Sequence, residues 1–343
     1  MTMMKAIRPS APDASDPSAC AVVETVSTPE PASGEYQVQL KLRPVNPADV
    51  FSLMGIYPGC QSPEHWPITM GLDGMGVITK AGPGTSKFEV GQRVAVAGFP
   101  LKEGNGTWAE YAAFKETDLA GIPDTVSDEA AAVFWVNPVT AYGMVRMLQL
   151  PKGAQVVVNA AGSALGGLIG DVARHMGLKT IGVVRRDAQV ADVLARGLDA
   201  CVSSEHGADV AKAIRDLTPN GEGAYAALEC VGGAATEAMV AALRPGGTLV
   251  IYGAMAGLTS TIAVVPICFF EVTVRGFWIN NYVAAMGAAE KEELINDVVK
   301  LLADGVMRAD KDVGKVFRLE DAAAAVRESS KPARGGKVFL DSR

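Results

Sequence analysis

The chain of 343 residues has few of the side chains that bind metals or form disulfides. It contains three histidines and five cysteines, and the cysteines are scattered without the spacing of zinc ligands. An odd, sparse set of cysteines is typical of free thiols in a reducing compartment, and it argues against a disulfide-rich secreted scaffold. The composition therefore gives no support for a metal centre.

Long apolar runs and an excess of positive charge are also missing. The most apolar later stretch, residues 261–270, contains a proline and is too short to span a bilayer. Residues 1–7 lack an apolar core of signal-peptide length. The net charge of −7 argues against nucleic acid or an anionic membrane surface as the main partner. We therefore expect a small-molecule partner and a cytoplasmic location, or an organelle matrix if a transit peptide was removed.

The most informative stretch that is present runs from Val156 to Gly167. An apolar, β-branched run ends in small residues, and a helical pattern follows. The pattern predicts a strand, a tight turn and a helix start, where free N–H groups and the helix dipole bind a pyrophosphate. The motif reads Ala-x-Ser-x-x-Gly rather than Gly-x-Gly-x-x-Gly, so close packing of strand and helix is an alternative. The residues predicted to contact a nucleotide here are Asn159, Ala161, Gly162, Ser163, Ala164, Leu165 and Gly166.

A second strand, expected over 179–184, ends in Arg185 and Arg186. NAD-binding units usually carry Asp or Glu at this point to hold the ribose 2′-OH. Guanidinium groups instead bind phosphate through paired hydrogen bonds. The pair therefore predicts NADPH, bound through its 2′-phosphate; the alternative is two solvated arginines at a helix start.

Strand and helix patterns alternate through the middle of the chain and predict a doubly wound parallel sheet of α/β type. The expected strands are 155–159, 180–184, 199–203, 224–229, 248–252 and 272–279, with helices over 163–177, 187–197, 207–217 and 234–243. The first ~120 residues are rich in glycine, proline and short β-type runs, which predicts a compact antiparallel domain. We expect residues 1–127 with 281–343 to form this β-rich domain and residues 128–280 to form the nucleotide-binding domain.

The order of six motifs resembles the medium-chain dehydrogenase/reductase family across essentially the whole chain. They are Val-Asn-Pro-Ala-Asp from Val45, Gly-Leu-Asp-Gly-Met-Gly from Gly71, Gly-Gln-Arg-Val from Gly91, Gly-Thr-Trp-Ala-Glu-Tyr from Gly106, Asn-Pro-Val-Thr-Ala-Tyr from Asn137 and the small-residue turn from Ala161. The resemblance implies a GroES-like first domain and a Rossmann second domain.

The chain departs from the zinc alcohol dehydrogenases of this family at the ligand positions. It has Asn46-Pro47-Ala48-Asp49 where they carry a Cys-His-x-Asp-like segment, and Gly71-Leu72-Asp73 where they carry Gly-His-Glu. No cysteine lies between Cys60 and Cys201, so the four-cysteine structural zinc lobe is missing. His65, His175 and His206 cannot supply a tetrahedral ligand set. We therefore predict a zinc-independent enzyme with no metal site.

Two zinc-free subgroups then remain, and both can carry a Gly-x-Tyr, here Gly55-Ile56-Tyr57. The segment from Trp135 to Tyr142 and the run Arg275-Gly276-Phe277-Trp278 are more similar to mitochondrial-type 2-enoyl thioester reductases than to quinone oxidoreductases. The resemblance implies NADPH-dependent reduction of the α,β double bond of 2-enoyl thioesters. The alternatives are a quinone or other activated-alkene reductase and a non-catalytic NADPH-binding protein.

For enoyl reduction we expect Tyr57 to protonate the α carbon, because a phenol of pKa about 10 stays protonated at neutral pH. Asn46 and Trp278 are expected to orient or enclose the substrate. Alternatively, Tyr57 and Trp278 only line or pack the site. Cys230, Val231 and Tyr252 are predicted to contact the cofactor because they end later parallel strands, whose C-termini line the nucleotide cleft. The other residues for which the resemblance implies contact with the cofactor are Thr140, Phe277, Trp278 and Lys337.

The run from Glu271 to Trp278 is apolar, rich in β-formers and placed at the end of the predicted sheet. An uncovered edge strand invites pairing with another chain. A partner related by two-fold symmetry would extend the sheet, as the family resemblance also implies. We therefore expect a homodimer.

Overall fold

The computed structural model describes residues 2–60, 64, 66–331 and 335–343 and divides into two compact units. Unit 1 comprises Met1–Val139, Ala288–Gly305 and Ala309–Arg343, and unit 2 comprises Thr140–Gly287 and Val306–Arg308. The units change over later in the chain than the expected domain bounds at 127–128 and 280–281. The reason at the first boundary is that helix α2 (Asp128–Ala132) packs against strands of unit 1.

Unit 1 is built on a sheet with the strand order β14-β15-β3-β4-β5-β7, and β6 also pairs with β3. Most pairs are antiparallel, as expected, whereas β14 and β15 run parallel. The strands of this sheet are β3 (Glu35–Pro44), β4 (Met75–Ala81), β5 (Arg93–Val96), β6 (Tyr111–Lys115), β7 (Leu119–Gly121), β14 (Val313–Arg318) and β15 (Lys337–Asp341). Strands β1 (Met3–Ile7) and β2 (Val23–Ser27) pair in a separate two-stranded antiparallel sheet. Its α-helices besides α2 are α1 (Pro47–Leu53), α10 (Ala288–Ala303) and α11 (Ala322–Ser329), and a π-helix, η4, covers Trp135–Val139.

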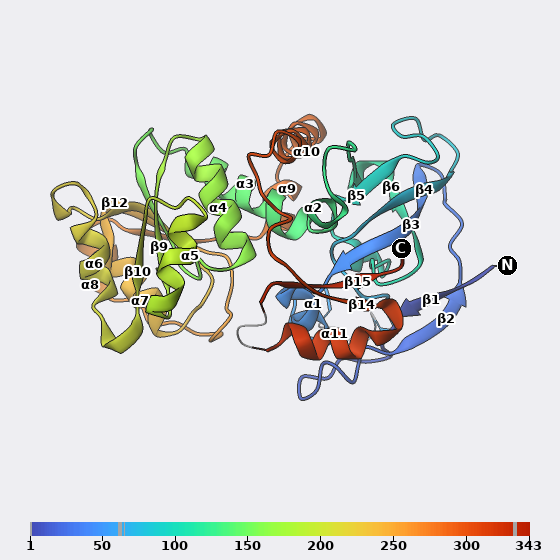
Figure 1. Ribbon diagram of the computed structural model, residues 1–343, viewed down its shortest axis with the longest axis horizontal. Coiled ribbons are helices and arrows are strands. Elements are labelled where there is room, and N and C mark those ends of the chain that lie inside the picture. The colour runs from blue at the N-terminus through green and yellow to red at the C-terminus, as the bar shows by residue number, and fades with distance from the viewer. Residues whose placement is uncertain (1, 61–63, 65, 332–334) are drawn as a thin grey trace. The chain divides into compact units, whose positions relative to one another are not determined.

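Strand β3 is the centre of this sheet because its sequence alternates with a period of two. Tyr36, Val38, Leu40 and Leu42 are each at most 1 % exposed. The C-terminal strand β15 pairs with the far end of β3, with Phe339 opposite Pro44. Segments from opposite ends of the chain therefore lie side by side in unit 1 (Figure 1).

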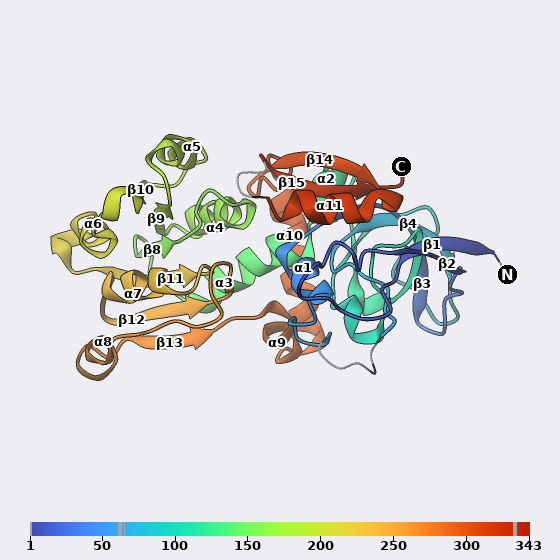
Figure 2. The ribbon, with the colours of Figure 1, turned by 90° about the horizontal axis from the view of Figure 1, so that it is seen from below.

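Unit 2 is a parallel sheet of six strands in the order β10-β9-β8-β11-β12-β13, which Figure 2 shows in sequence from β10 to the edge strand β13. The strands are β8 (Gln155–Val158), β9 (Lys179–Val184), β10 (Ala200–Ser203), β11 (Ala224–Glu229), β12 (Leu243–Ile251) and β13 (Thr273–Gly276). The helices are α3 (Thr140–Leu148), α4 (Ala164–His175), α5 (Val190–Ala195), α6 (Val210–Asp216), α7 (Ala234–Ala241), α8 (Val264–Phe269) and α9 (Ile279–Ala284). This is the strand order of a Rossmann dinucleotide-binding domain, so the predicted fold class is confirmed.

The last strand is shorter than predicted. The expectation of a strand over 272–279 is wrong beyond Gly276, because Phe277 donates the final backbone hydrogen bond to Ile251 O (2.9 Å) and Trp278 then caps α9. Among the described residues, no helix combines the length and the apolar character needed to cross a bilayer.

Candidate functional site

The strand order of unit 2 brings most of the predicted cofactor residues to one edge of its sheet. The chain runs outward from β8 to β9 and β10 on one side and to β11, β12 and β13 on the other, so β8 and β11 flank the switch point where such sheets bind ligands. Parallel strands end at the same edge. The predicted residues that follow these strand ends are Asn159 to Gly166 after β8, Arg185 and Arg186 after β9, Cys230 and Val231 after β11, and Tyr252 after β12.

The turn after β8 is shaped for close approach of a ligand. Ala160 has a φ of +47°, and Ser163 caps the 12-residue helix α4 by accepting a hydrogen bond from the Gly166 N–H at 3.0 Å. A Cβ at Gly166 would lie 2.9 Å from the Ala160 carbonyl oxygen, so this position requires glycine. Gly162 and Ser163 are exposed at the helix start. These features fit the pyrophosphate of a dinucleotide.

A buried carboxylate organises the same edge. The side chain of Glu229, which is 0 % exposed, accepts hydrogen bonds from Asn159 Nδ2 (2.5 Å), the Val231 N–H (2.6 Å) and Thr236 Oγ1 (2.5 Å). Asn159 Oδ1 accepts from the Cys230 N–H at 3.0 Å. Both polar ends of the Asn159 amide are thus held by the protein, and this network joins the ends of β8 and β11 to the start of α7.

Glu229 was missed at the level of sequence. It follows the apolar run Ala224–Leu228 directly, and that position is the available signal, because a charge at the end of a buried strand needs partners. Its donors are the Asn159 side chain after β8, the N–H groups of Val231 and Gly232 in the loop that follows Glu229, and the Thr236 hydroxyl of α7. Sequence patterns do not bring these groups together.

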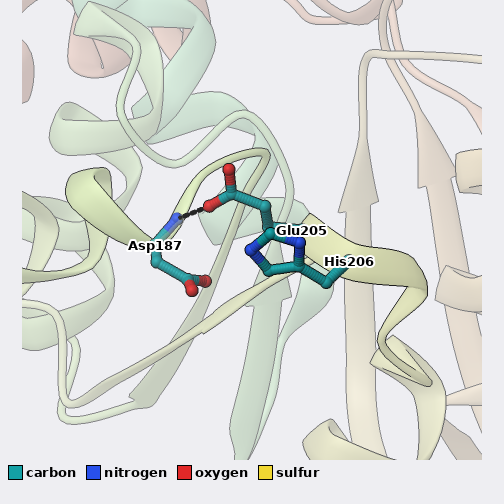
Figure 3. A group of neighbouring side chains, drawn as sticks. All are labelled: Asp187, Glu205 and His206. Atoms are coloured by element: carbon teal, nitrogen blue, oxygen red, sulfur yellow. Dashed lines mark hydrogen bonds between the residues drawn. The ribbon is translucent and has the colours of Figure 1, made fainter.

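Arg185 and Arg186 are exposed at the end of β9, as a phosphate-binding pair needs to be. The next residue, Asp187, donates its N–H to Glu205 Oε2 at 2.7 Å, and His206 lies within 4.8 Å of both carboxylates (Figure 3). Asp187 and His206 are exposed, and nothing else at this group indicates a metal. The contact instead fastens the end of β9 to the turn after β10.

Three further predicted residues begin or precede helices of unit 2. Phe277 is 7 % exposed and packs against Tyr282, with ring centroids 5.2 Å apart. A Cβ at Gly143 of α3 would lie 3.3 Å from the Phe277 ring, so glycine lets that ring approach the helix. Trp278 is half-buried, and Thr140 is 8 % exposed at the start of α3.

Tyr57 of unit 1 lies in the loop after helix α1. Its N–H donates to Phe51 O (3.2 Å), and its half-buried ring makes an edge contact with Phe99, with centroids 6.2 Å apart. Gly55 has a φ of +72°, and a Cβ there would lie 2.9 Å from Pro12. The glycine of Gly-x-Tyr is therefore required for this loop.

Asn46, Asp49, Asp73 and Lys337 form a buried polar group in unit 1, which we call the Lys337 cluster. The first three are 0 % exposed and Lys337 is 8 % exposed. Lys337 Nζ donates to Asn46 Oδ1 (2.5 Å), and Asn46 Nδ2 donates to Asp73 Oδ2 (3.1 Å). Asn46 was expected to orient the substrate, but protein partners engage both ends of its amide.

Burial raises the pKa of both carboxyl groups of the cluster, to about 7 for Asp49 and to about 6 for Asp73. The charge of Lys337 acts in the opposite direction on both pKa values. The cluster therefore contains two carboxyl groups whose ionised forms are destabilised by burial, and one ammonium that stabilises those forms.

Zinc does not fit this cluster. Asn46, Asp49 and Asp73 of the Lys337 cluster come from the two segments that by resemblance correspond to ligand segments of zinc alcohol dehydrogenases. The cluster offers carboxylates, an amide and an ammonium, with neither thiolate nor imidazole. His175 and His206 belong to unit 2, and His65 lies outside the described residues.

Comparison with known proteins agrees with this geometry. The family model described as alcohol dehydrogenase GroES-like domain matches residues 32–124, and the one described as zinc-binding dehydrogenase matches residues 164–298. The mitochondrial enoyl-[acyl-carrier-protein] reductase of Caenorhabditis elegans is 31% identical over 303 residues, covering 87% of this chain and 83% of that protein. The chain therefore belongs to the medium-chain dehydrogenase/reductase family, among the enoyl reductases that resemble quinone oxidoreductases, as predicted.

Solved structures show the same fold over the whole length. A quinone oxidoreductase of Pseudomonas syringae pv. tomato DC3000 matches with a TM-score of 0.85 and 27% identity, covering 99% of this chain and 100% of that chain. The complex of Etr1p with NADP and crotonyl-CoA matches with a TM-score of 0.85 at 21% identity and 100% coverage of both chains.

We predict that Glu229→Gln destabilises unit 2. The amide would place an NH₂ group against donors that now meet a carboxylate, and each unsatisfied buried group costs about 1–3 kcal/mol. Thermal unfolding of the free protein should shift downward by several degrees. The matched control is Glu237→Gln, an exposed position on α7; equal unfolding temperatures for the two variants would contradict the role of Glu229.

Proposed function

We propose that this protein reduces the α,β double bond of 2-enoyl thioesters with NADPH. The observation that carries the proposal is the 31% identity to a mitochondrial enoyl-[acyl-carrier-protein] reductase across 83% of that protein. The chain also retains Tyr57 in a loop fixed by Gly55 and Phe99, and it has a Rossmann unit with an exposed nucleotide turn. The acyl chain and its carrier, coenzyme A or acyl carrier protein, are left open.

The proposed cofactor is NADPH because the residues of unit 2 suit its phosphates. The turn 161–166, in which Gly162 and Ser163 are exposed, offers the N-terminus of α4 to the pyrophosphate. Arg185 and Arg186 offer two guanidinium groups to the 2′-phosphate. Thr140, Cys230, Val231, Tyr252, Phe277 and Trp278 are assigned to the remainder of the cofactor, with Asn159 acting through its bonds to Glu229 and Cys230. When bound, NADPH supplies the hydride that goes to the β carbon.

The protein's own contribution to the reaction is a proton and the positioning of its donor. The enolate that develops needs stabilisation and then a proton at the α carbon. We assign the proton donor to the Tyr57 hydroxyl, the enclosure of the substrate to Trp278, and the positioning of α1, which precedes the Tyr57 loop, to Asn46.

Quinone reduction is the second candidate function. It is favoured by the match to the quinone oxidoreductase of Pseudomonas syringae, which is 27% identical with a TM-score of 0.85. A quinone takes protons on oxygen, which exchanges protons readily with water, so this reaction does not require a donor at carbon. Dependence on Tyr57 therefore distinguishes the two functions.

A homodimer formed through the edge of the unit 2 sheet is the proposed assembly. β13 is the last strand of the sheet, and an open strand edge can pair with a second copy. Exposed apolar side chains gather in the segment before it: Leu258 and Phe269 are each 76 % exposed and Val264 is 69 % exposed.

All five cysteines are free thiols, which supports the proposed cytoplasmic or matrix location.

The first prediction of the proposed function concerns the choice between NADPH and NADH. Replacing Arg185 and Arg186 together by Ala should weaken NADPH binding at least ~10-fold and leave NADH binding nearly unchanged, because charged hydrogen bonds contribute about 1.5–3 kcal/mol each. Fluorescence titration with each cofactor measures both affinities. The control removes two cations elsewhere in unit 2, Lys152 and Lys212. Equal losses for NADPH and NADH would rule out the 2′-phosphate assignment.

The second prediction tests the reaction itself. The wild-type protein should oxidise NADPH with a medium-chain 2-enoyl-CoA, and Tyr57→Phe should lower that turnover roughly 10²–10⁴-fold, because a general acid contributes about that much. NADPH binding and any benzoquinone reduction should stay near wild-type levels. Tyr111→Phe, at a hydroxyl that accepts from Gln39 Nε2 (3.1 Å), is the control.

Near-normal enoyl reduction by the Tyr57→Phe variant would remove Tyr57 from the catalytic role. A wild-type protein that reduces benzoquinone alone would favour the second candidate. Binding of NADPH without turnover of either substrate would indicate a non-catalytic protein.

The third prediction concerns assembly. Light scattering at micromolar concentration should give about twice the chain mass of 35.7 kDa. Phe269→Asp should shift the mass toward the monomer, because it places a charge in the apolar patch, whereas Leu194→Asp on α5 should not. A monomeric wild-type protein would contradict the proposal.

A further inference from the structure

The Lys337 cluster joins three segments of unit 1 that are distant in sequence. Asn46 and Asp49 lie at the start of α1, Asp73 lies in the turn before β4, and Lys337 is the first residue of β15. Lys337 and Asn46 are 291 positions apart. No residue of the cluster is more than 8 % exposed, so the cluster lies inside the unit.

The register between β15 and β3 explains how the lysine reaches this position. Phe339 pairs with Pro44, and the Val45 N–H donates to Val338 O at 2.8 Å. Continuing the same antiparallel register by one residue brings Lys337 opposite Asn46. The ammonium then donates to the Asn46 amide oxygen at 2.5 Å, while the amide nitrogen donates to Asp73 at 3.1 Å.

The two carboxylates extend the cluster to neighbouring backbone. Asp49 accepts from the N–H groups of Asn46 (2.7 Å) and Leu72 (2.9 Å). Asp73 accepts from the N–H groups of Trp135 (3.0 Å) and Val136 (3.1 Å), which begin the π-helix η4. Buried carboxylates are stable only when hydrogen bonds and a cation offset their lost hydration. Backbone N–H groups and the Asn46 amide supply the hydrogen bonds, and Lys337 supplies the cation.

We propose that Lys337 is the cation of this cluster and a positioning residue: its ammonium, held through Asn46, offsets Asp49 and Asp73 and fixes α1 and η4 relative to β15. Lys337 thus bonds to Asn46, which lies in the segment that by resemblance corresponds to a ligand segment of zinc alcohol dehydrogenases. The inference concerns the folded unit and does not depend on which substrate the protein reduces.

The test is a double-mutant cycle on the free protein, read by thermal unfolding. Lys337→Met keeps the length of the side chain but leaves two carboxylates without their cation, and it should lower the unfolding temperature by roughly 10 °C. Lys337→Arg keeps the charge and should recover a large part of that loss. Lys300→Met removes a lysine whose ammonium pairs with Asp304 at the surface of unit 1, and this control should shift the temperature by less than about 2 °C.

Asp73→Asn supplies the other arm of the cycle. Alone, it sets its own NH₂ group against that of Asn46, whose oxygen is held by Lys337. Combined with Lys337→Met, it removes one negative charge and lets the Asn46 amide turn over to accept from the new NH₂. The double variant should therefore be more stable than the sum of the two single losses predicts.

A pH series adds a readout that simple loss of packing would not move. In the folded protein the pKa values of Asp49 and Asp73 are raised to about 7 and about 6. The contribution of these two groups to the free energy of unfolding is therefore fully present below their unfolded pKa values, and it is lost as pH rises through their folded pKa values. Without the ammonium this loss grows, so the deficit of Lys337→Met should be larger at pH 8 than at pH 5.

Additive losses in the cycle, or an unchanged unfolding temperature for Lys337→Met, would overturn the proposal. So would weaker NADPH binding by Lys337→Met at wild-type stability, because Lys337 would then act only on the cofactor. If Lys337→Met yields no folded protein, recovery of a folded double variant supports the proposal. A double variant that also fails to fold contradicts it.

Discussion

A carboxylate taken out of water must be surrounded by donors or cations, and this constraint shapes both units of the protein. In unit 1, Asp73 gathers the first N–H groups of η4 and the amide of Asn46. In unit 2, Glu229 gathers Asn159, the N–H of Val231 and the hydroxyl of Thr236. Each carboxylate fastens the loop or helix start that follows a buried segment, and those are the segments that carry the proposed site residues.

Local patterns were enough to predict the Rossmann unit. The apolar run before Asn159, the small residues after it and the helix to His175 are one continuous signal, and the structure has β8, the turn and α4 at that place. The edge strand was predicted too long, because β propensity continues through Phe277 and Trp278 although the partner strand β12 ends at Ile251. Propensity does not report where a neighbour stops.

The buried networks could not be predicted for a related reason. Lys337 was assigned to the cofactor by resemblance, and its contact with Asn46 depends on pairing between strands from opposite ends of the chain. Asn46 and Asp73 differ from the residues that zinc alcohol dehydrogenases carry in their ligand segments, but nothing in the sequence indicates that a lysine joins Asn46 and Asp73. Loss of the metal ligands and gain of an internal cation are thus visible together only in the folded unit.

Delivery of hydride from NADPH to the β carbon of an enoyl thioester is the step on which the proposed function depends. The most direct measurement uses NADPH deuterated at the transferred position with a medium-chain 2-enoyl-CoA in ordinary water, and locates the label in the product by mass spectrometry and NMR. We expect a saturated thioester with deuterium at the β carbon and a solvent-derived proton at the α carbon. An unchanged enoyl thioester in a sample that still reduces a benzoquinone with the same NADPH would contradict it.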